Sequence, residues 1–211
     1  MIIVRVLFVS LVLGSGGVCR SWADDVSQLG RAIETWDRGL LAEALSGIDA
    51  QAKVKPHDAG LAYWQSVGAF HTVLMDKPSD EGVAVVLETV RRGHTLDPDH
   101  REINAMLCVL YGMRIQANKM RAVWVGPRVM NLGKKALALP ENPRALYLVA
   151  TCRYYGGHGK KDYEEALSLL TRAEALFVEE ARRPPSQMEP RWGRAQCARF
   201  IKMTSGKLGL Q

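Results

Sequence analysis

The chain has 211 residues, 47% of them hydrophobic and 24% charged, with a formal net charge of +6 at pH 7. This length suits one compact domain or one short repeat array. The charges are interspersed along the chain, whereas a nucleic-acid binder gathers basic residues on one face, so no nucleic-acid partner is expected.

Residues 1–23 are predicted to be a secretory signal peptide. A short apolar run follows one basic residue, and Ser21 and Ala23 form the small-x-small pattern of a cleavage site, with cleavage expected after Ala23. A lipoprotein would use Cys19, but Val18 stands where a small residue is expected. We therefore expect a periplasmic or otherwise exported protein that meets the membrane only through this transient segment.

The rest of the chain is predicted to be helical. Apolar residues recur at spacings of three and four, and alternating runs of β-branched residues are absent. Pro56, Pro98 and Pro140 are 42 residues apart, and Pro184 follows 44 residues later, each at the end of an apolar helical run. Two helical runs fill each period, which predicts repeated helix pairs.

Helix starts carry predicted caps. Asp99 with Glu102, and Asp162 with Glu165, have the spacing of capping boxes, and Ser79 or Asp80 is expected to cap a further helix.

The glycine-rich stretch "YYGGHGKKD" before that last helix lacks the first glycine and the hydroxyl residue of a Walker A loop. It is interpreted as a helix end with a left-handed glycine cap at Gly156 or Gly157. No nucleotide and no other cofactor is expected.

Helix pairs that end in "LDP" or "LPENP", with small residues where the helices cross, resemble the tetratricopeptide repeat family. The clearest match is "NPRALYLVATCRYY" followed by "YEEALSLLTRAEALF". The stretches "GPR" and "PRWG" are also similar to exported bacterial proteins of this kind. The family repeat has 34 residues, whereas these units run to 42 or 44. The resemblance implies an all-α, right-handed stack of antiparallel helix pairs, an α-solenoid, with enlarged inter-helix loops.

This reading divides the chain into four parts. After the signal peptide come an N-terminal capping helix pair at 24–56, the repeat domain at 57–203 and a flexible C-terminal tail at 204–211.

The candidate binding residues fall into two groups. One is the segment 114–128, expected to be an inter-helix elaboration, whose arginines suit carboxylates and whose indole can stack with guanidinium groups. It contains Arg114, Asn118, Arg121, Trp124 and Arg128. The alternative is a solvated basic face with the tryptophan packed on a neighbouring unit. The second group recurs on first helices, which the resemblance places on a concave surface, although each ring is also a candidate core residue: Tyr111, Tyr154, Tyr155 and Trp192.

No catalytic or metal-binding pattern is found in the sequence. Cys108, Cys152 and Cys197 lie 44 and 45 residues apart and are expected to be buried small hydrophobic residues, because equivalent positions on neighbouring helices exceed the ~7 Å limit for a disulfide. There is no Cys-x-x-Cys and no G-x-S-x-G motif. We expect no enzyme activity, no catalytic residue and no metal.

The functional hypothesis is an exported scaffold that binds a protein or peptide in a helix-lined groove. The alternative is a periplasmic accessory component of a transporter, with an anionic solute held near Arg114, Arg121 and Arg128.

Overall fold

The computed structural model describes residues 21–76, 78–157, 159–184 and 189–210. Within these residues it contains helices and no strand, which confirms the all-α prediction. The helices are α1 (Trp22–Thr35), α2 (Arg38–Val54), α3 (Ala59–Met75), α4 (Asp80–Leu96), α5 (Arg101–Ala117), the 3₁₀ helix η1 (Lys119–Arg121), α6 (Ala122–Ala136), α7 (Pro143–Gly156), α8 (Lys160–Arg182) and α9 (Arg194–Leu208).

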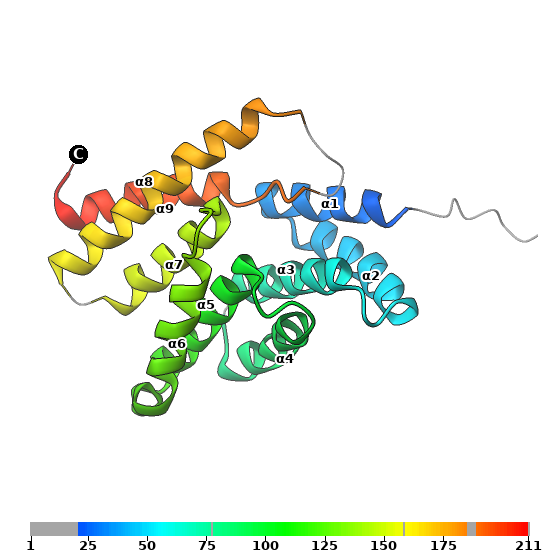
Figure 1. Cartoon of the computed structure of the whole chain (residues 1–211), viewed down its shortest axis with the longest axis horizontal. Helices are drawn as coiled ribbons and strands as arrows, with labels where there is room; N and C mark the ends of the chain where they lie inside the picture. Colours follow the sequence, from blue (N-terminus) through cyan, green and yellow to red (C-terminus); the bar gives the residue numbers. More distant parts are fainter. Residues whose placement is uncertain (1–20, 77, 158, 185–188, 211) are drawn as a thin grey trace, which may run out of the picture.

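The helices pack in consecutive pairs, α1 with α2, α3 with α4, α5 with α6 and α7 with α8, and α9 packs on α8 (Figure 1). Successive pairs stack through α2 on α3, α4 on α5 and α5 on α7. This is the arrangement of an α-solenoid, in which each unit buries its apolar stripe against its neighbours.

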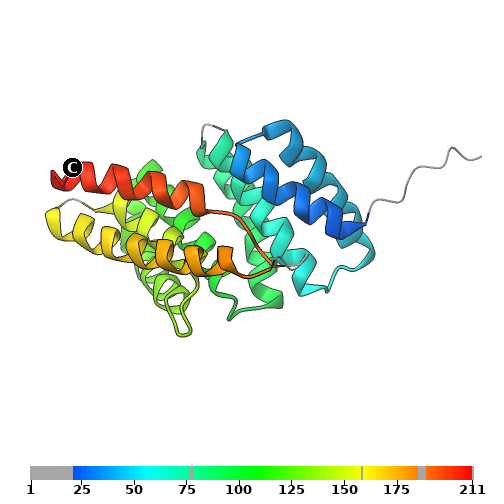
Figure 2. The ribbon, with the colours of Figure 1, turned by 90° about the horizontal axis from the view of Figure 1, so that it is seen from above.

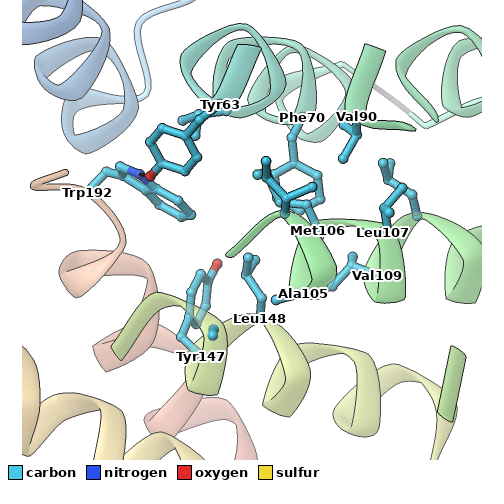
Figure 3. Close-up of a cluster of buried hydrophobic side chains, with 14 of the residues drawn as sticks. Tyr63, Phe70, Val90, Ala105, Met106, Leu107, Val109, Tyr147, Leu148 and Trp192 are labelled. Carbon is cyan, nitrogen blue, oxygen red and sulfur yellow. Dashed lines mark hydrogen bonds between the residues drawn. The ribbon is translucent and has the colours of Figure 1, made fainter. Parts of the chain in front are cut away.

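The core follows α3, α5 and α7, which pack against helices on both sides. In α5 every residue from Glu102 to Tyr111 is buried, whereas α4 buries only one face. A helix that is apolar all round belongs inside a helical stack, and an amphipathic helix belongs at its surface. Figure 3 shows this core where Phe70 of α3 meets Met106 and neighbouring residues of α5.

The enlarged inter-helix loops predicted from the sequence are wrong. Residues 76–79 join α3 to α4, and 157–159 join α7 to α8. The extra residues of each unit lengthen the helices instead, to 17 residues in α4 and α5 and to 23 in α8. Longer helices bury more apolar surface per unit than longer loops would.

The segment 118–127, predicted as an elaboration, is also largely helical. It forms η1 and the first turns of α6, and Pro127 lies inside α6. Proline in a helix clashes with the residue before it through that residue's Cβ. Gly126 has no Cβ, so the helix continues through the Gly-Pro pair.

The cap predictions have mixed outcomes. Ser79 caps α4 as predicted, since its hydroxyl accepts a hydrogen bond from the Gly82 amide at 3.0 Å. Asp162 does not cap α8: the helix begins after Gly159, and the Asp162 carboxylate accepts from the Gly159 amide at 3.2 Å.

Two other helix ends differ from the prediction. His100, not Asp99, precedes α5, and its side chain makes no capping bond. Gly157 follows α7 in an extended conformation with φ −77°, not in a left-handed one.

The chain ends also differ from the predicted division. The flexible tail expected at 204–211 is wrong, because α9 continues to Leu208 and Thr204 is buried with its hydroxyl bonded to the Phe200 carbonyl at 2.7 Å. Residues 1–20 of the predicted signal peptide lie outside the described residues. Ser21 caps α1 in a capping box with Asp24, so the predicted cleavage point after Ala23 falls in the first turn of α1.

No helix in the described ranges combines the length and the apolar character needed to cross a membrane.

Candidate functional site

Trp192, a predicted binding residue, is in the core. It is 1% exposed, and its indole Nε1 donates to the Tyr63 hydroxyl at 3.2 Å (Figure 3). Its ring makes a T-shaped contact with the His71 ring. Trp192 belongs to residues 189–193, which we name the closing segment. The indole is therefore part of the core, packed on Tyr63 and His71 of α3, and is not available to a partner.

The closing segment is anchored to helices that are far from it in sequence. The Gly193 amide donates to Glu34 of α1 at 2.9 Å, and Arg144 of α7 donates to the Pro190 carbonyl. Figure 2 shows the described segment before α9 entering this helix at the end that lies nearest α1. The closing segment thus packs against the first helices of three pairs, α1, α3 and α7.

Beneath this segment lies a buried polar cluster that the sequence analysis missed. Arg144 pairs with Glu180, and Glu102 accepts hydrogen bonds from Tyr63 and from Asn142. Burial raises the pKa of Tyr63 and of Glu180 above their ordinary values. Charges removed from water need partners of this kind, so the cluster fixes the packing of α3, α5, α7 and α8 around the closing segment.

Two of the predicted arginines bind a carboxylate of the chain itself. Arg121 donates to both carboxylate oxygens of Asp80 at 2.7 and 2.9 Å, and Arg114 donates to the same group at 3.2 Å. The hydrogen bonds from Arg121 lower the pKa of Asp80 below its ordinary value of 3.8. The Asp80 carboxylate in the first turn of α4 is thus the anion that Arg114 and Arg121 bind, in place of the partner or solute carboxylate that was expected.

The next predicted residues also have internal roles. The Asn118 side chain accepts from the Met120 amide at 3.1 Å and so caps η1. Tyr111 is 4% exposed, and the guanidinium groups of Arg91 and Arg128 lie 5.6 and 4.9 Å from its ring centre. Tyr111 therefore joins α4 to α6 through two cation–π contacts.

The tyrosine pair at the end of α7 mainly packs the C-terminal helices. Tyr154 and Tyr155 meet the Phe200 ring of α9 at 5.7 and 5.9 Å between ring centres. Tyr155 remains exposed, and its carbonyl accepts from Gln116 of α5 at 3.0 Å.

The main exposed apolar surface lies on α6 and η1, and Trp124 is at its centre with 65% of its area exposed. We name it the α6 apolar face, and it consists of Met120, Val123, Trp124, Pro127 and Met130. These positions follow the spacing i, i+3, i+4, i+7 and i+10, which is one face of a helix. The opposite face packs through Leu132 and Ala136 on the core.

Basic residues surround the α6 apolar face. Lys119 lies at one end, Lys134 at the other and Arg128 along one edge, and within the described residues none of the three has a carboxylate within 4.0 Å. Between Glu102 and Glu141 the sequence contains no acidic residue. The surface thus combines exposed apolar area with uncompensated positive charge.

This face was not predicted, because the segment 114–128 was interpreted as an inter-helix elaboration and not as part of a helix. The spacing of the five apolar residues is typical of a helix, but the Gly-Pro pair within the segment is typical of a turn or loop.

The three cysteines within the described residues form no disulfide. Cys108 and Cys197 are buried, as predicted, whereas Cys152 is half-buried with its thiol 3.7 Å from the Cys108 carbonyl. In the part of the chain that the structure describes, no group of three His, Cys, Asp or Glu side chains is placed to hold a metal ion.

Comparison with protein-family models finds no match, and neither a curated protein nor a solved structure matches the chain.

Proposed function

We propose that this chain is an exported, tetratricopeptide-like scaffold that binds a partner protein. The stacked helix pairs and the proline-delimited repeats support the family resemblance, in which the stack is right-handed. The N-terminal sequence supports export. The binding surface in this proposal is the α6 apolar face and not the helix-lined groove of the original hypothesis.

The observation that carries the proposal is the exposure of Trp124, Val123 and Met130 on one helix face, at 65%, 76% and 66%. Single exposed apolar residues are common, but a contiguous group rimmed by polar residues marks interaction sites. Tryptophan is also among the residues that most often dominate binding energy.

The groove is a weaker candidate because the closing segment packs against α1, α3 and α7, which were expected to line it, and buries Trp192 there. The anionic-solute alternative is the weaker one, because Asp80 already accepts hydrogen bonds from both Arg114 and Arg121 and offsets one of their two positive charges.

Site-specific photo-crosslinking tests the proposal. A photo-reactive amino acid replaces Val123 on the α6 apolar face or, as a control, Val85 on α4, which is exposed to a similar extent at 71%. In the native host we expect a defined protein adduct from position 123 and none from position 85. Equal adducts from both positions, or none from either, would show that α6 is not the binding surface.

A further inference from the structure

We infer that the partner binds through an amphipathic α-helix that carries carboxylates along the edges of its apolar face and packs lengthwise on α6. This inference rests on the proposed function and adds the chemistry of the partner.

The shape of the α6 apolar face favours a helix. Its residues form a ridge from Met120 to Met130, about 15 Å long at 1.5 Å per residue. Ridges with i, i+3 and i+4 spacing pack into the grooves of another helix. The described residues offer no strand to which an extended peptide could add.

The charge of the face selects an acidic partner. Lys119 and Lys134 mark its two ends, roughly 20 Å apart along the helix axis, and Arg128 lies on one edge. A second copy of this chain would bring the same cations together, which costs binding energy. A helix of about four turns with carboxylates near both ends meets these cations and covers the apolar residues between them.

An anionic bilayer has the same charge but fits less well. Asp99 lies 4.0 Å from Lys135 of α6 and has 94% of its side chain exposed. A flat anionic surface laid along α6 would approach this carboxylate to within a Debye length of about 8–10 Å. A helix about 10–12 Å in diameter can cover the apolar face without covering Asp99.

Binding of two designed peptides to the full chain tests the inference. One 18-residue helical peptide carries leucines on one face and glutamates along its edges, and the second replaces each glutamate by lysine. In fluorescence anisotropy we expect the glutamate peptide to bind at least about ten-fold more tightly. Val123→Asp should weaken this binding at least ten-fold, whereas the matched control Val85→Asp should bind like the wild type.

Charge reversal completes the test. Lys119→Glu combined with Lys134→Glu should reverse the preference in favour of the lysine peptide. Equal affinities for the two peptides, or binding to vesicles of phosphatidylglycerol and phosphatidylcholine without binding to either peptide, would overturn the inference.

Failure of the inference and failure of the proposed function are distinguishable. If position 123 crosslinks to a protein while neither peptide binds, the scaffold function stands and the acidic helix is wrong. If position 123 gives no protein adduct, the proposed function itself fails.

Discussion

His71 is buried in α3 between two aromatic rings. Its Nδ1 lies 2.8 Å from the Val67 carbonyl oxygen, and its ring makes T-shaped contacts with the rings of Phe70 and Trp192. Burial lowers its pKa from 6.5 to about 4. The neutral imidazole therefore acts as an apolar core residue that still satisfies one backbone group.

The lowered pKa predicts acid sensitivity. Between pH 6.5 and 4 the unfolded chain binds a proton at His71 that the folded chain does not, so stability falls as the pH falls through this window, by about 2–3 kcal/mol at pH 4.5. Urea unfolding at pH 7 and pH 4.5 checks this against His71→Phe, which lacks the titrating group. Parallel pH profiles for the two proteins would contradict the prediction.

At the scale of the helix, Gly93 and Gly206 have opposite surroundings. A Cβ added to Gly93 of α4 would lie 2.6 Å from Ser66 Oγ and 3.4 Å from the Ala62 carbonyl oxygen. A Cβ added to Gly206 of α9 would meet no atom within 4 Å. The close packing of α3 on α4 thus requires a glycine, whereas α9 does not.

The two alanine variants should therefore shift stability in opposite directions. Gly93→Ala should lower the free energy of unfolding by about 1–3 kcal/mol through overpacking. Gly206→Ala should raise it by about 0.5–1 kcal/mol, because alanine loses less backbone entropy in a helix. Thermal unfolding measures both, and shifts of the same sign in Tm would contradict the argument.

The helix pairs could be predicted from the sequence because their signals are local. The spacing of apolar residues and the prolines at helix ends lie within a few residues of the structure that they specify. The contacts that decide the candidate site are not local. Asp80 is 41 residues from Arg121, and Trp192 is 129 residues from Tyr63. No local pattern in the sequence predicts that Trp192 is buried in the core whereas Trp124 is exposed at the surface.

Across the whole molecule, the closing segment links the two ends of the stack. Besides the Gly193 contact to Glu34, Gln196 of α9 donates to the Ile33 carbonyl of α1 at 2.9 Å. An open solenoid has contacts only between neighbouring units, and its ends can unfold separately. Here the last helix also holds the first, which should make the array unfold as one unit.

Removal of the Trp192 side chain tests this coupling. Trp192→Ala should lower the free energy of unfolding by about 3–5 kcal/mol and separate the unfolding of α1 and α2 from that of the central helices. Trp124→Ala is the matched control and should change stability by less than about 0.5 kcal/mol. Urea unfolding and hydrogen exchange measure the two effects. Unchanged protection of α1 in the Trp192 variant would contradict the coupling.

The closing segment also sets the order in which the chain can fold. The hydrogen bonds from Gly193 to Glu34 and from Gln196 to Ile33 span 159 and 163 residues, a far greater sequence separation than that of contacts between neighbouring repeats. During synthesis, α1 to α7 can assemble while Trp192 is still inside the ribosome. The contacts of Tyr63, His71 and Arg144 with Trp192 can then form only after the last part of the chain has been synthesised. Docking of Trp192 should therefore be a late and slow phase of folding, separate from the rapid stacking of the helices.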